Sequence, residues 1–372
     1  MTGDAAPAGA NAYRIAVVPG DGIGPDVCAA AIAVIEAALG SGHKLRFDSY
    51  PAGANCYRET GSAFPAETRE AVAKAHAVLH GAAGLPDVVY PDGTEAGQDF
   101  SMQIRAALDL YANVRPIRLY DGVRSRLNFD RPTPIDYVIV RENTEGLYAA
   151  RGGGNLLRDD TATDTLVLTR KGVERVVRFA AELARRRDGA PRDGRRRVTI
   201  VDKANVLRSF AFFRRVAEEV LAGYPDIEVD YALSDAMTVY QLERPDTFDV
   251  VVTENFVGDI ISDLGAATVG GLGMGASAEI GDAHGYFQGS HGSAPDIAGQ
   301  GIANPFATIL SGAEMLDWLG LRHGDAELTA AAGRIRDAVA KTLAAGRHVT
   351  RDLGGTAGTM QCADAVSRAC SP

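Results

Sequence analysis

Hydrophobic positions follow two alternating patterns, short apolar runs rich in β-branched residues and longer stretches in which apolar positions recur every three or four residues. The short runs predict strands at Arg14–Val18, Leu45–Tyr50, Ala77–His80, Tyr137–Val140, Val198–Val201, Ile227–Tyr231 and Val250–Thr253. The longer stretches predict helices at Pro25–Leu39, Phe100–Leu108, Gly172–Arg186, Leu207–Leu221, Pro305–Leu319 and Ala326–Ala345. This alternation indicates an α/β fold with a largely parallel sheet, and 372 residues are enough for two lobes.

One segment departs from the alternation. Residues 147–168 are first rich in glycine, then rich in Asp and Thr, and then β-branched. This order is typical of neither a buried strand nor an amphipathic helix. We interpret the segment as an arm that pairs with another subunit.

Composition limits the kinds of binding partner and the cellular compartment that we expect for this protein. A net charge of −10 disfavours nucleic acid, whose phosphates require clustered Lys and Arg. The four cysteines form no CxxC pair and stand at no zinc-binding spacing, which favours reduced thiols in the cytosol. No apolar stretch approaches the roughly 20 residues of a membrane span, and the first residues lack the features of a signal peptide. We therefore expect a cytoplasmic protein without nucleic-acid or membrane partners.

A glycine-rich motif, GDGIGP at 20–25, follows a predicted strand and opens a predicted helix. It lacks the third glycine of the G-x-G-x-x-G dinucleotide fingerprint. We therefore interpret it as a tight strand-to-helix turn near the active cleft rather than as a pyrophosphate loop.

Three arginines, Arg105, Arg115 and Arg141, are candidates for binding carboxylates. The guanidinium group offers a planar fork of donors that matches a carboxylate at two points. For any single arginine an ordinary ion pair is the alternative. That alternative is weaker for Arg141, because it ends an apolar strand and such ends face the ligand crevice in α/β sheets.

Two acids suggest a metal site. Asp259 and Asp263 are four residues apart and would share one face of a helix that we expect to begin near Gly258. Two like charges so placed repel unless a cation lies between them, and oxygen ligands favour Mg²⁺ or Mn²⁺. The alternative is an acid that complements the helix dipole, which explains Asp259 but not Asp263, one turn further in.

Three further features are less specific. The loop at 289–305 is rich in glycine and small residues, and it contains Asp296, a candidate ligand of a ribose diol; a nucleotide loop and a structural loop fit it equally well. Lys203 follows a buried strand and would serve as a base, unless its amine reaches solvent. Tyr148, seven residues after Arg141, is a candidate proton donor.

Together these motifs resemble the β-decarboxylating dehydrogenases, which comprise isocitrate, 3-isopropylmalate, homoisocitrate and D-malate/tartrate dehydrogenases. The resemblance extends from about Ala16 to Ala365. Its motifs are GDGIGP (20–25), LDLYANVRP (108–116), RENTEG (141–146) followed by Tyr148, VDKANVL (201–207), DAM (235–237), NFVGDIISD (255–263), HGSAPDIAGQGIANP (291–305) and DLGGTAGT (352–359).

The resemblance implies a reaction: NAD-dependent and Mg²⁺- or Mn²⁺-dependent oxidative decarboxylation of a (2R)-2-hydroxy acid with a 3-carboxylate. The three arginines would bind the carboxylates of the substrate, and Tyr148 would protonate the enolate. Lys203 of the partner subunit would remove the hydroxyl proton. The implied metal ligands are Asp259, Asp263 and, from the partner subunit, Asp235. The implied cofactor residues are Asn205 near the nicotinamide and, around the adenosine, His291, Gly292, Ser293, Ala294, Pro295, Asp296 and Asn304.

The resemblance also implies an isopropylmalate-dehydrogenase-like two-lobed fold, with a mixed, largely parallel twisted sheet that is not a true Rossmann fold. One lobe would hold residues 1–110 and 265–372, and the other residues 111–264, including the arm at 147–168 as an intersubunit clasp. We expect a homodimer with shared active sites, or a tetramer built from such dimers.

The specificity positions depart from the family patterns. Ser101 and Met102, which share a helix face with Arg105, match neither the apolar pair of isopropylmalate enzymes nor the Ser and Asn of isocitrate enzymes. This favours a small or polar C3 group, as in D-malate or tartrate. Gln288 stands where the family usually has Glu. Asp296 favours NAD, because a carboxylate accepts hydrogen bonds from the ribose 2′-hydroxyl and repels a 2′-phosphate.

The alternative function is a non-catalytic regulatory subunit of a hetero-oligomeric isocitrate-type dehydrogenase. Such a subunit would be expected to have lost metal or arginine ligands. All of the implied ones are present in this sequence.

Overall fold

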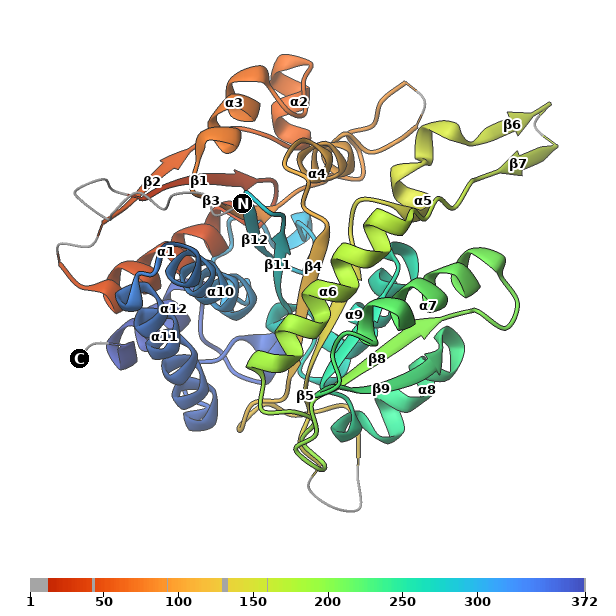
Figure 1. Ribbon diagram of the computed structural model, residues 1–372. Coiled ribbons are helices and arrows are strands. Elements are labelled where there is room, and N and C mark those ends of the chain that lie inside the picture. The colour runs from red at the N-terminus through yellow and green to blue at the C-terminus, as the bar shows by residue number, and fades with distance from the viewer. Residues whose placement is uncertain (1–12, 42–43, 92, 129–132, 159, 371–372) are drawn as a thin grey trace.

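A sheet of ten strands runs through the whole molecule (Figure 1). The structure is a computed structural model, and it describes residues 13–41, 44–91, 93–128, 133–158 and 160–370. The strand order is β2-β1-β3-β12-β11-β4-β5-β10-β8-β9. The strands are β1 Tyr13–Gly20, β2 Leu45–Ser49, β3 Ala77–Ala82, β4 Ala112–Arg118, β5 Asp136–Glu142, β8 Arg197–Asp202, β9 Glu228–Leu233, β10 Val250–Thr253, β11 Ala276–Ile280 and β12 Gly285–Gly289.

The sheet is mixed and largely parallel, as predicted. Only the pairings β12–β11, β11–β4 and β4–β5 are antiparallel within it. Strands on the β2 side of the β11–β4 junction come from the first and last parts of the chain, and strands on the other side come from residues 112–253. At the junction Glu279 pairs with Asn113, so distant parts of the sequence meet in the middle of the sheet.

Helices cover both faces of this sheet (Figure 1). Four of them, α1, α10, α11 and α12, pack against one another beside β11, β12 and β3, while α6 and α7 lie against β5, β8 and β10 and α9 lies against β4 and β5. The helices are α1 Gly24–Leu39, α2 Ala54–Thr60, α3 Ala66–Lys74, α4 Ala96–Ala107, α5 Gly146–Ala149, α6 Arg170–Arg186, α7 Arg208–Leu221, α8 Ser234–Glu243, α9 Asn255–Thr268, α10 Phe306–His323, α11 Ala326–Ala345 and α12 Thr359–Cys370. No helix among the described residues combines the length and apolarity needed to cross a membrane.

All seven predicted strands and all six predicted helices correspond to elements of the structure. Three strands of the ten-stranded sheet escaped the sequence pattern, and they are the ones that make the antiparallel junction. Strand β4 contains two arginines and a proline, and β11 and β12 contain Gly, Ala, Ser and polar residues. Such strands alternate between two different environments and lack the β-branched run that marks a buried parallel strand.

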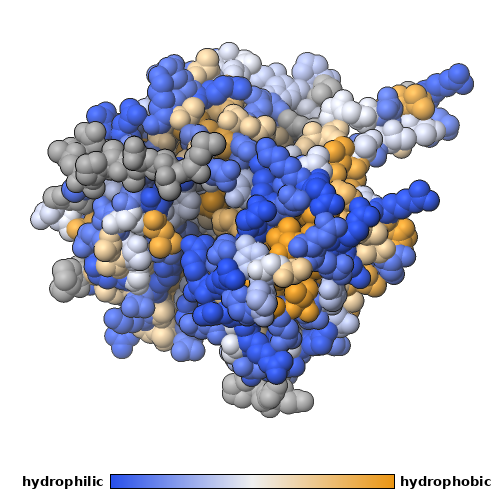
Figure 2. All heavy atoms as spheres, viewed as in Figure 1, coloured by the Kyte–Doolittle hydropathy of each residue, from blue (hydrophilic) through white to orange (hydrophobic). Residues whose placement is uncertain are grey.

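The segment at 147–168 forms a two-stranded hairpin that projects from the body of the molecule (Figure 1). Its strands are β6 Asn155–Leu157 and β7 Thr161–Thr163, and a bridge between Gly146 and Val167 closes its base. Leu156 and Leu157 are exposed on it. Hydrophobic side chains are visible on this arm in the space-filling view (Figure 2).

Candidate active site

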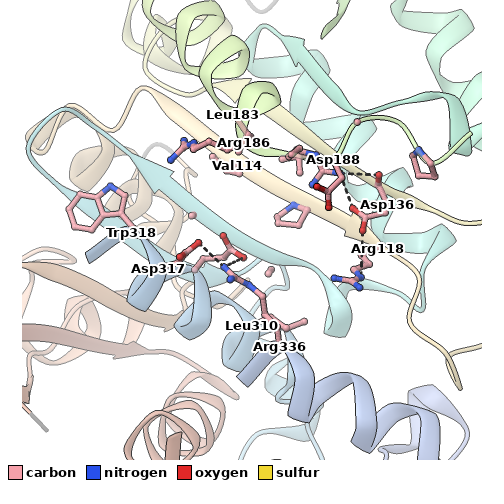
Figure 3. Close-up of a pocket in the computed structure, with 18 of the residues that line it drawn as sticks. Val114, Arg118, Asp136, Leu183, Arg186, Asp188, Leu310, Asp317, Trp318 and Arg336 are labelled. Atoms are coloured by element: carbon pink, nitrogen blue, oxygen red, sulfur yellow. Dashed lines mark hydrogen bonds and ion pairs between the residues drawn. The ribbon is translucent and has the colours of Figure 1, made fainter. Parts of the chain in front are cut away.

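Two cavities lie on opposite faces of the same strands, because side chains alternate between the faces of a sheet. On β4, Arg115 lines a cavity of about 420 Å³, the front cavity, while Val114 and Pro116 line one of about 920 Å³, the back cavity (Figure 3). The front cavity collects most of the candidate residues. Those that line it are Ser101, Met102, Arg105, Arg115, Arg141, Tyr148, Asp259, Asp263, His291 and Gly292.

Arg105 is held by a buried carboxylate that the sequence did not reveal. Its Nε donates to Glu279 at 3.0 Å and its Nη2 at 2.7 Å, although the two residues are 174 positions apart. Glu279 also accepts hydrogen bonds from the amides of Asn113, Asn143 and Gln288. Glu279 is fully buried, so this group fixes the guanidinium from beneath the cavity.

Arg141 is the second-to-last residue of strand β5 and lines the front cavity, as expected near the end of a strand. Its Nε and Nη2 donate to Asn255 Oδ1 at 3.0 and 2.7 Å, and its Nη1 donates to Asp259. A Cβ at Gly258 would lie 2.6 Å from the Arg141 side chain, so only glycine allows this close packing. Burial lowers the pKa of Arg141 to about 10, although Asp259 opposes the shift.

Asp259 and Asp263 lie on α9, which begins at Asn255 rather than near Gly258. Burial tends to raise the pKa of Asp259, but the charge of Arg141 and the hydroxyl of Tyr148 outweigh burial and lower it. Burial raises the pKa of Asp263, against the opposing charge of Arg115, whose Nη1 is 3.9 Å away. Neither acid stands in the first turn, so the helix-dipole alternative explains neither.

Tyr148 reaches the same acids from the short helix α5. Its hydroxyl donates to Asp259 Oδ2 at 2.9 Å, and its ring lies beside the Arg141 guanidinium. Burial, and next the charge of Asp259, raise the pKa of Tyr148 to about 12. The phenol is therefore protonated at neutral pH, as a proton donor must be.

The donor set fits a hard divalent cation in part. Asp259 and Asp263 offer carboxylate oxygens one helical turn apart on the cavity wall. No group of three or more His, Cys, Asp or Glu side chains able to hold a metal occurs within the described part of the chain. The remaining ligands would therefore be water, substrate oxygens or a side chain of another subunit.

Eight predicted site residues lie outside this cavity, five of them on the loop between Ser293 and Asn304 and three on other segments. Lys203, Asn205 and Asp235 are absent from its lining, and the Lys203 amine instead donates to Asp235 at 2.6 Å near the surface. Asn205 is exposed. The single chain therefore does not bring these residues to the arginines and acids of the front cavity.

The loop at 289–305 begins at the front cavity and continues over the GDGIGP turn. The Ser293 carbonyl accepts a hydrogen bond from the Ile23 amide, and a Cβ at Gly22 would lie 1.9 Å from that carbonyl. Ala294 has a φ of +39°, so the loop turns sharply there. Pro295 and Asp296 are exposed beyond this turn.

Polar contacts fix both ends of this loop region. The Asp21 carboxylate of the GDGIGP turn accepts hydrogen bonds from the amides of Ala54, Asn55 and Gly84. Asn304 donates to Asp352 at 2.8 Å and accepts from the Phe306 amide at the start of α10. The acid of the glycine-rich motif thus organises backbone, which agrees with its interpretation as a tight turn.

The sequence and the fold of this chain are similar to those of known proteins. Residues 14–368 match the family model described as isocitrate/isopropylmalate dehydrogenase. The chain is 44% identical over 357 residues to the 3-isopropylmalate/3-methylmalate dehydrogenase of Methanocaldococcus jannaschii, covering 96% of this chain and 98% of that protein. It is 38% identical over 365 residues to a probable tartrate dehydrogenase/decarboxylase of Agrobacterium vitis, covering 96% and 97%. The crystal structure of isocitrate dehydrogenase from Methylococcus capsulatus superposes with a TM-score of 0.84 at 38% identity, covering 97% and 100%.

Proposed function

The chain belongs to the isocitrate/isopropylmalate dehydrogenase family, and we propose that it carries out NAD- and Mg²⁺- or Mn²⁺-dependent oxidative decarboxylation of a (2R)-2-hydroxy acid with a 3-carboxylate. The chain is a dehydrogenase of the family that decarboxylates hydroxy acids. One observation supports the specific reaction most strongly. Three buried guanidiniums, Arg105, Arg115 and Arg141, converge with Asp259 and Asp263 on one small cavity.

The side chains of the cavity have complementary tasks. Arg115 and Arg141 bind the two carboxylates and hold C2 and C3 of the substrate in position. The Tyr148 hydroxyl gives a proton to C3 after CO₂ has left, which its raised pKa allows. Lys203 of the partner subunit accepts the proton of the C2 hydroxyl.

Asp259, Asp263 and Asp235 of the partner subunit would hold the divalent cation. A cation held there would act as a Lewis acid toward the hydroxyl and the developing enolate. The carboxylates of Asp259 and Asp263 are the accessible oxygens of the cavity wall, with side chains 39% and 55% exposed.

A homodimer would complete the site. Lys203 and Asp235 lie outside the cavity of their own chain, so a second copy must supply them if they act. Exposed apolar side chains on the arm, on α8 and on α9 support such an interface. They are Leu156, Leu157, Val239, Leu242, Phe256 and Ile260. We propose that residues 111–264 form this dimerising lobe, that residues 1–110 with 265–372 form the other, and that the arm clasps the partner.

NAD would supply the hydride acceptor, bound along the loop at 291–305. The exposed carboxylate of Asp296 supports NAD over NADP, because it would repel a 2′-phosphate. Asn205 of the partner subunit would lie near the nicotinamide. A cytoplasmic location remains our expectation.

The C3 group would lie beside Ser101 and Met102, with Gln98 next to them on the cavity wall. Two of these three side chains offer hydrogen-bonding groups, which supports a small or polar substituent, as in D-malate or tartrate. The relatives act, by their names, on 3-isopropylmalate, 3-methylmalate and tartrate.

The test is steady-state kinetics of the purified chain with NAD⁺ and Mn²⁺, comparing kcat/KM for D-malate, tartrate, 3-isopropylmalate, isocitrate and homoisocitrate. We expect turnover that a chelator abolishes and that excess Mn²⁺ restores. We also expect at least about tenfold higher kcat/KM with NAD⁺ than with NADP⁺. A chain that turns over none of these acids alone, but activates a second dehydrogenase subunit, would instead be the regulatory subunit.

A further inference from the structure

Each of the three guanidiniums in the front cavity faces one carboxylate. Arg105 pairs with Glu279 at 2.7 Å, Arg115 lies 3.9 Å from Asp263, and Arg141 pairs with Asp259. Three positive charges are thus matched by three negative ones. The Lys203–Asp235 pair, if it comes from the partner subunit, adds one charge of each sign and leaves this balance unchanged.

The three carboxylates differ in what they can reach. Asp259 and Asp263 are accessible on the cavity wall, whereas Glu279 has no exposed side-chain surface. Glu279 accepts five hydrogen bonds, two from Arg105 and one each from Asn113, Asn143 and Gln288. A cation in the cavity can therefore draw away the partners of Arg115 and Arg141, but not the partner of Arg105.

Burial by itself would raise the pKa of Glu279, but the charge and hydrogen bonds of Arg105 outweigh burial and lower it. The carboxylate is therefore ionised at neutral pH and neutralises Arg105 permanently. The remaining N–H groups of Arg105 can still donate hydrogen bonds to a ligand. The Arg105–Glu279 pair as a whole, however, carries no net charge.

We propose, on the basis of the function proposed above, that Glu279 is a specificity-determining residue that restricts the substrate to two carboxylates and an uncharged C3 group. A cation held by Asp259 and Asp263 would leave Arg115 and Arg141 free to bind the two carboxylates. On this proposal the C3 group would lie beside Ser101 and Met102, which share a helix face with Arg105, so Arg105 is the arginine that would face it. A third carboxylate there would meet a guanidinium that Glu279 has already neutralised.

The unusual residue at position 288 fits this assignment. The Gln288 amide donates to Glu279 at 3.1 Å across the antiparallel strands β11 and β12. A glutamate at 288, usual in the family, would place a second carboxylate against Glu279 and repel it. Gln288 instead stabilises the negative charge of Glu279, so the carboxylate of this region stands on β11 rather than on β12.

The test compares a tricarboxylate with dicarboxylates in the wild type and in Glu279→Gln, which removes the charge and keeps the size. Isocitrate is the tricarboxylate, and D-malate, tartrate and 3-isopropylmalate are the dicarboxylates. We expect wild-type kcat/KM for isocitrate to lie at least about 100-fold below that of the best dicarboxylate. In Glu279→Gln the ratio of isocitrate to that dicarboxylate should rise at least about tenfold. A wild type that uses isocitrate as well as its best dicarboxylate, or a ratio that Glu279→Gln leaves unchanged, overturns the proposal.

Glu142→Gln is the matched control, because Glu142 is equally buried but accepts hydrogen bonds from Thr144 and Glu145 instead of from Arg105. It should leave the ratio unchanged, and an equal shift in this variant would also contradict the assignment. A binding readout accompanies the kinetics: tricarballylate, titrated calorimetrically in the presence of Mn²⁺, should bind Glu279→Gln at least about tenfold more tightly than the wild type.

If Glu279→Gln does not fold, the wild-type substrate panel and tricarballylate titration decide the question by themselves. Tricarballylate binding to the wild type as tightly as the dicarboxylate succinate would then count against Glu279. A wild type inactive with every acid would contradict the proposed function instead, which keeps the two failures distinct.

Discussion

The two faces of the central strands carry charges in contrasting ways. In the front cavity, buried arginines point inward to one place, from β4, β5 and α4. The back cavity is more than twice as large, but its floor is apolar, with Val114, Val138, Ala276 and Ala278. Its charges stand toward the rim, at the ends of β4, β5 and α6 on one side and on α10 and α11 on the other (Figure 3).

The pairing of these rim charges differs from that at the front. Arg336 donates to Glu314 at 3.0 Å and lies 3.2 Å from Asp317, and Arg187 pairs with Asp136 at 2.9 Å. All of these side chains keep contact with solvent, where an ion pair costs little to form and contributes little. Burying guanidiniums that face a cavity costs far more, and a ligand that needs them accounts for that cost. Convergence of buried charge, rather than volume, is therefore our reason for proposing the front cavity as the functional side.

The largest effect on activity should follow from removing the charge of a carboxylate in the front cavity. Asp259→Asn keeps the shape of the side chain but loses the charge that a divalent cation requires, and we expect kcat/KM to fall at least about 1,000-fold. Steady-state kinetics at saturating Mn²⁺ checks this, with thermal unfolding to show that the variant folds. Retained turnover would remove the front cavity as the metal site.

Complementation tests whether the front site needs a second chain, unlike the back cavity, which one chain completes. Asp259→Asn and Lys203→Met should each be nearly inactive alone. After joint refolding, half of the dimers are mixed, and each mixed dimer has one intact site of two, so activity should recover to about one quarter of the wild-type value. Activity that stays at the level of the separate variants would place Lys203 and Asp259 in the same chain's site, or deny Lys203 a role.

Tyr148→Phe should lower kcat by about 100-fold and change KM little, because the proton is needed only after the substrate has bound. The pKa of Tyr148, raised to about 12, places loss of its proton above the usual assay range. The alkaline limb of the wild-type profile below pH 9 should therefore not report this residue. A fall in kcat of the same size accompanied by a large rise in KM would indicate that Tyr148 binds the substrate instead.

A buried histidine on the front side should make stability depend on pH. Burial lowers the pKa of His80 to about 4, while its Nδ1 donates to the Val18 carbonyl at 2.7 Å. Between pH 6.5 and pH 4, His80 is protonated in the unfolded chain but stays neutral in the folded chain. The free energy of unfolding therefore falls as the pH decreases from about 6.5 to about 4. The contribution amounts to about 3 kcal/mol over that range. Urea unfolding at several pH values should show a shallower dependence in His80→Gln, and an identical slope would exclude His80 as its source.

The smallest effect should come from the back rim. Asp317→Asn removes one of the two partners of Arg336 and leaves Glu314 in place. We expect kcat/KM to stay within about twofold of the wild type and the free energy of unfolding to change by less than about 1 kcal/mol. A loss of activity comparable to that of Asp259→Asn would erase the contrast between the two faces.

The sequence was sufficient for features that depend on local periodicity and on residue chemistry. Strand and helix periods lie within single segments, so the predicted elements and the α/β class emerged directly. Arg141 and Asp259 stood out for the same reason, since a charge at the end of an apolar strand or one turn inside a helix is anomalous without reference to the rest of the fold. The motif order carried the family resemblance.

Long-range pairing decided what remained. Strand β4 and strand β11 become neighbours only when the sheet assembles, and that junction brings Glu279 to Arg105 across 174 residues. The same assembly leaves Lys203 and Asp235 outside the front cavity of their own chain. In the sequence Glu279 is one acid among 48 acidic residues, and nothing local distinguishes a buried, fully hydrogen-bonded carboxylate from a solvated one. Its environment comes from groups on four separate segments, and only folding places them around it.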